Sequence, residues 1–148
     1  MGKRRLSREF ALKFLYQLDV VCDKSDENQI DFNTEINNFL STQEDIRDED
    51  TKKFMITLAT GVYENMEGID RIITKYSDNW KISRMSKIDR NILRLAVYEM
   101  RNLSNIPHPV TINEAVDIAK KYGTNESGSF INGIIDRVRI AFEKGENN

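Results

Sequence analysis

The chain has 148 residues, a length typical of one domain, and its 39% hydrophobic and 31% charged residues exclude the sparsely hydrophobic, highly charged class of disordered proteins. The single cysteine, Cys22, excludes an intrachain disulfide framework, and no apolar run has the length that a bilayer requires. Charged residues interrupt the first apolar segment, which argues against a signal peptide. We therefore expect one domain over residues 1–148, located in the cytoplasm and not in a membrane.

The net charge of −2 conceals a strong segregation of charge along the chain. Residues 1–13 carry five bases and one acid, a net charge of +4, whereas residues 19–50 carry eleven acids and two bases, a net charge of −9. A phosphate backbone responds to charge within a screening length of about 8 Å at physiological salt. The N-terminal segment is therefore a candidate for phosphate contacts, and we interpret the acidic segment as a solvated face.

Helical periodicity dominates the first half of the chain. Apolar residues from Leu6 to about residue 22 fall on one side of a helical wheel, with Ser7 as the expected N-cap. An acidic loop at residues 23–30 and a short helix at 31–42 follow. The acids at 48–50 then favour the positive end of the next helix, which extends to about residue 66.

The second half is also helical. The pattern continues to about residue 80 with a break near Gly68, and a strong helix follows over residues 88–103. The sequence "IPHP" ends that helix, and Thr111 with Glu114 forms a capping box for a helix that ends at Tyr122. The last helix covers about residues 129–143. Because no alternating strand pattern is present, we predict an all-α fold of about seven helices in two small packed bundles.

Two residues interrupt this pattern. Glu99 lies in the middle of the apolar stripe of helix 88–103, where a carboxylate needs hydrogen bonds. We expect it to accept them from an arginine or from a neighbouring helix start rather than to act as a general base. Gly133 follows Asn132 within a helical period, which indicates close approach by another helix or a ligand.

The motifs of common enzymes are missing from the sequence. It has no glycine-rich phosphate loop with a lysine and no paired cysteines for zinc, and its one histidine, His108, lies between two prolines. No convergent catalytic group accompanies Glu99. We therefore expect a non-enzymatic protein with no metal and no cofactor.

One face of the first helix combines bases with an aromatic ring. The wheel places Arg5, Arg8, Leu12 and Tyr16 opposite the apolar side, and Lys3 and Arg4 precede them. Single-stranded nucleic acid binds such surfaces through phosphates and stacked bases, although a solvated charged face is the commoner role of a single helix. The loop at residues 123–129, flanked by Tyr122 and Phe130, is a second candidate surface; either ring alone is more often part of a core.

Four stretches together resemble the NusB family of transcription antitermination and termination factors. They are "SREFALKFLYQLD" (7–19), "ATGVYENMEGIDRII" (59–73), "DRNILRLAVYEM" (89–100) and "VTINEAVDIAKKYGTNESGSFINGIIDRV" (110–138). The resemblance implies the all-helical NusB fold and pairing with NusE, a small-subunit ribosomal protein. It also implies binding of boxA RNA in nascent transcripts, indirect association with other Nus factors and RNA polymerase, and support of ribosomal RNA synthesis.

The resemblance assigns roles to individual residues. Arg4, Arg5 and Arg8 match arginines that contact RNA in relatives, and the basic face adds Lys3. Tyr122, Glu126 and Phe130 match the loop that completes the RNA surface. Tyr16 and Asp89 match positions that face NusE, so for Tyr16 we follow the resemblance rather than the stacking role.

The chain departs from the family at one informative position. Relatives commonly carry a basic residue before "FVNG", but here Ser129 precedes "FING", which removes one phosphate contact; Lys120 and Lys121 are candidates to replace it. The family's fold also occurs fused to an RNA methyltransferase, and 148 residues lead us to expect the stand-alone form. The alternative function is a helical protein-interaction module whose basic helix binds acidic protein surfaces.

Overall fold

The computed structural model describes residues 2–24 and 30–145, and all the regular secondary structure in these residues is helical. The chain divides into two compact units, the N-terminal unit (1–60) and the C-terminal unit (61–148). The helices are α1 (Lys3–Lys24), α2 (Phe32–Thr42), α3 (Glu49–Glu64), α4 (Met66–Tyr76), the short 3₁₀ helix η2 (Ile82–Arg84), α5 (Lys87–Asn102), α6 (His108–Tyr122) and α7 (Ser127–Glu143). The predicted all-α fold is confirmed; the expectation of one domain over residues 1–148 stays a prediction.

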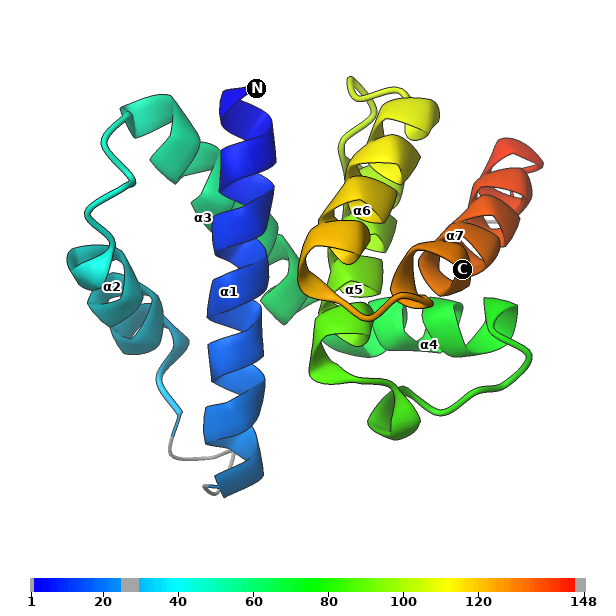
Figure 1. Ribbon diagram of the computed structural model, residues 1–148, viewed down its shortest axis with the longest axis horizontal. Helices are drawn as coiled ribbons and strands as arrows, with labels where there is room; N and C mark the ends of the chain where they lie inside the picture. The colour runs from blue at the N-terminus through cyan, green and yellow to red at the C-terminus, as the bar shows by residue number, and fades with distance from the viewer. Residues whose placement is uncertain (1, 25–29, 146–148) are drawn as a thin grey trace. The chain divides into compact units, whose positions relative to one another are not determined.

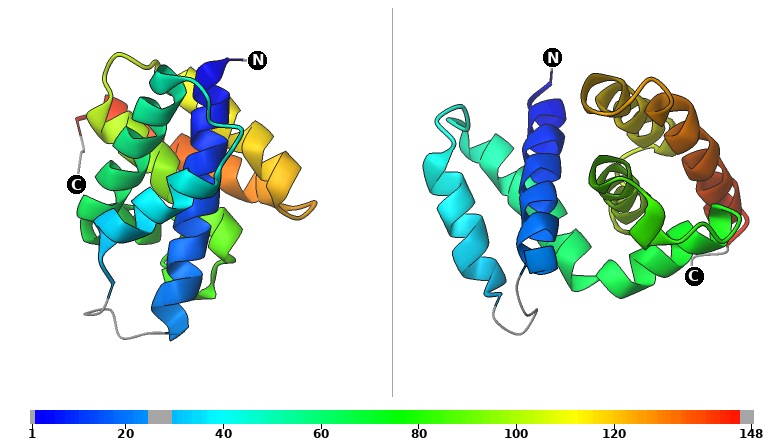
Figure 2. Two further views of the ribbon diagram at one scale, coloured as in Figure 1. Left: turned by 90° about the vertical axis from the view of Figure 1, so that its left-hand side faces the viewer. Right: turned by 60° about the horizontal axis from the view of Figure 1, so that its bottom comes forward.

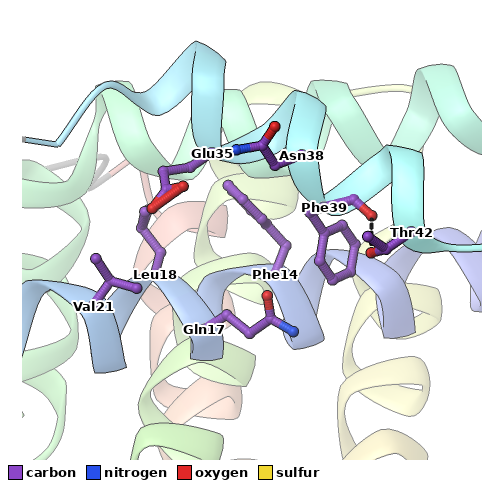
Figure 3. Close-up of a pocket in the computed structure, with 8 residues that line it drawn as sticks. All are labelled: Phe14, Gln17, Leu18, Val21, Glu35, Asn38, Phe39 and Thr42. Carbon is purple, nitrogen blue, oxygen red and sulfur yellow. Dashed lines mark hydrogen bonds between the residues drawn. The ribbon is translucent and has the colours of Figure 1, made fainter.

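In the N-terminal unit, α2 lies beside α1 (Figure 1). Phe14 on α1 is the centre of this contact, because its ring centroid lies 5.5 Å from that of Phe32 and 5.4 Å from that of Phe39. A hollow of about 270 Å³ lies between the two helices. Figure 3 shows side chains that line it, among them Phe14 from α1 and Glu35, Asn38 and Phe39 from α2. Aromatic packing therefore holds α2 against α1.

A buried hydroxyl joins α1 to the first turn of α3. Ser7 is fully buried, and its Oγ donates a hydrogen bond of 2.7 Å to the carbonyl oxygen of Thr51. The predicted role of Ser7 as an N-cap is wrong, because α1 begins four residues earlier at Lys3. The predicted loop at 23–30 is also displaced: residues 23 and 24 belong to α1, and residues 25–29 lie outside the described part of the chain.

The C-terminal unit is built around α5, which packs against α4, α6 and α7 (Figure 2). The guanidinium of Arg94 on α5 forms a bidentate ion pair with the carboxylate of Asp70 on α4, with Nε–Oδ1 and Nη2–Oδ2 distances of 2.8 and 2.9 Å. On the α6 side, the hydroxyl of Thr111 donates to Oε1 of the buried Glu99 at 3.0 Å. The prediction that Glu99 accepts a hydrogen bond from a neighbouring helix start is confirmed.

Several predicted boundaries in this unit move. The break between α3 and α4 lies at Asn65, and Gly68 is inside α4. The capping box at Thr111 is wrong: α6 begins at His108, with Pro109 in its first turn, where a proline loses no hydrogen bond. The hydroxyl of Thr111 is thereby free to serve Glu99.

Candidate nucleic-acid interface

The start of α1 and the first half of α3 form a basic hollow in the N-terminal unit. It encloses about 710 Å³ and is lined by Gly2, Lys3, Arg4, Ser7, Asp50, Lys53, Phe54 and Thr57. The guanidinium carbon of Arg4 lies 4.5 Å from the centroid of the Phe54 ring, and that of Arg8 lies 5.6 Å from it. Two cations therefore meet at one ring, an arrangement whose attraction is worth about 0.5–1 kcal/mol per pair at exposed sites.

The exposure of these bases separates them into two groups. Lys3, Arg4 and Lys53 are exposed and Arg5 is half-buried, but Arg8 is only 5% exposed. The predicted exposed face is therefore wrong at Arg8, and also at Leu12, which is 1% exposed. The wheel failed at Arg8 because the ring of Phe54 on α3 lies against its guanidinium, and a hydrogen bond between Ser7 and Thr51 joins the two helices there.

Sequence reasoning missed the contribution of α3 to this hollow. Lys53 and Phe54 are adjacent in the sequence and repeat the pairing of a base with a ring. That pairing was a usable signal, but its connection with Arg4 and Arg8 of α1 is visible only in the folded structure. The hollow thus presents cations from two helices around one aromatic side chain.

In the C-terminal unit, the loop between α6 and α7 is shorter than predicted, residues 123–126. The hydroxyl of Ser127 accepts a hydrogen bond of 2.9 Å from the backbone N–H of Thr124, and a Cβ at Gly123 would overlap Ser127. Thr124 in turn accepts from the N–H of Glu126 at 3.3 Å through its hydroxyl. Some of the polar residues therefore hold the loop itself, while the side chains of Asn125 and Glu126 are exposed.

The two rings that flank this loop are half-buried. The ammonium of Lys121 lies 5.3 Å from the centroid of the Tyr122 ring. Phe130 makes an edge-to-face contact with Trp80, at 5.4 Å between centroids and 69° between planes. Trp80 comes from the connection between α4 and α5 and was not identified from the sequence; a lone tryptophan in a polar stretch was the available signal.

The two residues expected to face a protein partner have different surroundings. The side chain of Tyr16 on α1 is 39% exposed. Asp89 lies in the first turn of α5, where its N–H donates to the Oγ of Ser86 at 3.0 Å. Its Oδ1 is buried and has no hydrogen-bond partner among the described residues. A buried carboxylate oxygen without a donor is costly to the fold.

The described part of the chain offers neither a metal cluster nor a membrane-spanning helix. Within residues 2–24 and 30–145, no group of three or more His, Cys, Asp or Glu side chains is arranged to hold a metal ion. In the same part of the chain, no helix combines the length and the apolar character needed to cross a bilayer.

Residues 2–24 and 30–145 form seven α-helices in two compact units, with cations and a ring at the start of α1. These features are those of a small helical protein with a surface suited to a polyanion. The model of the NusB family matches residues 5–139. The transcription antitermination protein NusB of Acetivibrio thermocellus is 47% identical over 135 residues, which cover 91% of this chain and 87% of that protein. The chain belongs to the NusB family.

Solved structures agree with this assignment. A structure of T. maritima NusB has a TM-score of 0.81 and 36% identity, covering 97% of this chain and 96% of that chain. A structure of the antitermination factors NusB and NusE in complex with dsRNA has a TM-score of 0.80 and 26% identity, covering 95% of this chain and 98% of that chain. The resemblance inferred from the sequence is confirmed at the level of family and fold.

Proposed function

We propose that this chain is a non-enzymatic RNA-binding transcription antitermination factor. It pairs with NusE, binds boxA RNA in nascent transcripts in the cytoplasm, and supports ribosomal RNA synthesis together with other Nus factors and RNA polymerase. The observation that carries the proposal is the basic hollow, where Arg4 and Arg8 converge on the ring of Phe54. The similarity to a NusB that was solved with NusE and dsRNA supports it.

The exposures within the hollow assign different roles to its bases. Lys3, Arg4 and Lys53 are exposed and would contact phosphates directly. Arg8 is buried against Phe54, so it would hold the Phe54 ring in place and add positive charge without contacting a phosphate directly. Arg5 is half-buried and adds to the positive potential of the N-terminal end of α1.

The loop at the start of α7 supplies the second set of proposed RNA contacts. Tyr122 and Phe130 are half-buried rings with accessible surface for a base, and Glu126 is an exposed acid. Because a carboxylate repels phosphate, Glu126 should weaken binding to any RNA that approaches this loop. Its charge is therefore a direct probe of whether the loop contacts RNA.

NusE is proposed to contact Tyr16 and Asp89. Tyr16 offers an exposed ring with a hydroxyl, and such side chains are enriched in protein interfaces. Asp89 is a half-buried acid in the first turn of α5, and a cationic or polar donor of NusE would contact its carboxylate. Asp89→Asn should therefore weaken NusE binding while leaving the affinity of the free chain for RNA unchanged.

The test is fluorescence anisotropy of a labelled boxA-type RNA, with and without NusE, beside a scrambled RNA. We expect selective binding that NusE tightens, a weaker affinity for Arg4→Gln, and a modestly tighter affinity for Glu126→Gln. Arg4 is preferred to Arg8 because replacing the buried Arg8 would also disturb packing. Arg101→Gln, an exposed base at the C-terminal end of α5, is the matched control and should bind as the wild type does.

Two results would redirect the proposal. If Arg4→Gln weakens binding and Glu126→Gln has no effect, the α6–α7 loop is not part of the interface. If NusE binds but no RNA binds, even to the complex, the chain is a protein-interaction module instead. The second result would be the expected behaviour of a basic helix that recognises acidic protein surfaces.

A further inference from the structure

The connection after α4 is a tight, hydrogen-bonded turn that holds a tryptophan at the surface. Asp78 and Asn79 have φ angles of 57° and 62°, the left-handed region that Asp and Asn tolerate better than most residues. The N–H of Asn79 donates to the carbonyl of Thr74 at 3.0 Å, and that of Trp80 donates to the carbonyl of Ser77 at 3.1 Å. These bonds fix the position from which the indole of Trp80 projects.

Trp80 is unusually exposed for its size. Half of its surface is accessible to solvent, more than for any other large apolar side chain in the described part of the chain. Its edge-to-face contact with Phe130 leaves ring surface uncovered and orients the indole beside the start of α7. A rigidly oriented and half-exposed aromatic ring is the kind of platform on which nucleobases stack.

The charges around this ring favour an anion. A hollow of about 830 Å³ is lined by residues 77–81 together with Arg84. Lys81 and Arg84 are exposed, and neither forms an ion pair within residues 2–24 and 30–145. The one acid that lines the hollow, Asp78, forms an exposed ion pair with Arg137, with 3.3 Å between Oδ1 and Nη1. Two available cations thus adjoin an exposed indole.

We propose that Trp80, Lys81 and Arg84 form a further nucleotide subsite for single-stranded RNA, in which a base stacks on Trp80 and its flanking phosphates contact Lys81 and Arg84. This proposal rests on the proposed function, because it extends the RNA surface from Phe130 to Trp80 through their direct contact. It also supplies positive charge beside Phe130, where Ser129 provides none. An acidic protein segment would use the cations but would leave the exposed indole without a stacking partner.

The first experiment uses the intrinsic fluorescence of the protein, because Trp80 is its only tryptophan. An unlabelled boxA-type RNA should quench the emission in a saturable manner and should protect Trp80 from quenching by acrylamide. Anisotropy of a labelled RNA is recorded under the same conditions. Saturated anisotropy with unchanged tryptophan emission would overturn the subsite, whereas no anisotropy change at all would overturn the proposed function itself.

The second experiment uses variants of the cations, which are exposed and make no ion pair in the described residues. Lys81→Gln combined with Arg84→Gln should weaken RNA binding and reduce the slope of log affinity against log salt by about 0.7 for each lost phosphate contact. Arg101 lies in the last turn of α5, and Arg101→Gln should change neither the affinity nor the slope. An unchanged affinity in the double variant would overturn the proposal.

The third experiment tests the ring. Trp80→Ala should weaken RNA binding at least about fivefold, and Trp80→Phe should retain most of the affinity because a phenyl ring also stacks. Circular dichroism and thermal unfolding check that both variants are folded. If NusE rather than RNA quenches Trp80, the surface binds protein and the RNA subsite is rejected.

Discussion

Glu99 and Thr111 show how one buried carboxylate is accommodated between helices. Glu99 is 2% exposed, and the Thr111 hydroxyl donates to it at 3.0 Å. Thr111→Val keeps the shape of the side chain but removes this donor, so we expect a loss of about 1–3 kcal/mol in the free energy of unfolding. Urea denaturation measures the loss, and Thr111→Ser is the control that keeps the hydroxyl. A selective loss of RNA binding with unchanged stability would contradict the structural role of Glu99.

Two glycines make a matched pair for testing close packing. A Cβ at Gly61 in α3 would overlap the ring of Tyr98 on α5, whereas the nearest described atom to a Cβ at Gly133 is the Arg137 Nη2, 4.0 Å away. Gly61→Ala should destabilise the protein by about 1–3 kcal/mol through overpacking. Gly133→Ala should stabilise it by up to about 1 kcal/mol, because alanine favours a helix interior. Thermal and urea unfolding decide between the signs, and stabilisation by both substitutions would show that Tyr98 moves freely.

These glycines also show where sequence reasoning stops. The prediction of close approach by another helix at Gly133 is wrong, while Gly61, which is closely approached, drew no attention. A glycine in a helical pattern shows that a side chain is absent at that position, but it does not predict which side chain of another helix lies against it. The prediction that Arg8 is exposed was wrong for the same reason. A helical wheel describes one helix alone, whereas Arg8 is buried and contacts Phe54 of α3.

At the scale of the element, the polar side chains near helix starts fall into two kinds: some cap their own helix, and others form hydrogen bonds with a different helix. Asp31 accepts a hydrogen bond from the N–H of Asn33, and Ser86 accepts one from that of Asp89. The predicted acidic start of α3 is also confirmed, with Asp48 accepting from Thr51. Ser7 and Thr111, by contrast, have the composition of caps but use their hydroxyls between helices. Sequence predicts a helix start well only where the hydroxyl or carboxylate has no competing partner elsewhere in the fold.

The start of α3 gives a prediction about pH. The N–H and hydroxyl of Thr51 and the ammonium of Lys3 lie 3.1, 3.2 and 3.5 Å from the Asp48 carboxylate, and the hydrogen bond from the Thr51 backbone is the main cause that lowers the pKa of Asp48. A carboxylate whose pKa is lower in the folded state stabilises the protein above its unfolded-state pKa, and this contribution disappears as the pH falls through the folded-state pKa.

Asp48→Asn isolates that charge, because the amide oxygen still accepts a hydrogen bond from Thr51. The variant should be modestly less stable than the wild type at pH 7, and the difference should vanish as the pH falls below the folded-state pKa of Asp48. Urea unfolding of both proteins across this pH range measures the difference. A stability difference that persists at low pH would mean that the substitution disturbs the geometry of the cap rather than its charge.

At the scale of the whole molecule, the family and the helical fold were predictable because both depend on features that extend along most of the chain. The family model matches residues 5–139, and hydrophobic periodicity recurs in each long helix. The candidate RNA surface was only partly predictable. The sequence predicts its arginines and Phe130. Only the folded structure reveals that Phe54 contacts Arg4 and that Trp80 contacts Phe130.

Salt dependence tests the electrostatics of the whole molecule, since an overall net charge of −2 gives no reason to expect a bound polyanion. Each phosphate of a single strand that a cation neutralises contributes about −0.7 to the slope of log affinity against log salt. Contacts from Lys3, Arg4 and Lys53 alone predict a slope of about −2, and adding Lys81 and Arg84 makes it about −3.5. Anisotropy titrations at several salt concentrations measure this slope. The protein-interaction alternative, dominated by apolar anchors, predicts a nearly flat dependence for its partner. We expect a steep slope that Arg4→Gln and the Lys81, Arg84 double variant each reduce. Arg101→Gln should leave the slope unchanged. This outcome would show that RNA binds to the local basic surfaces despite the acidic character of the whole chain.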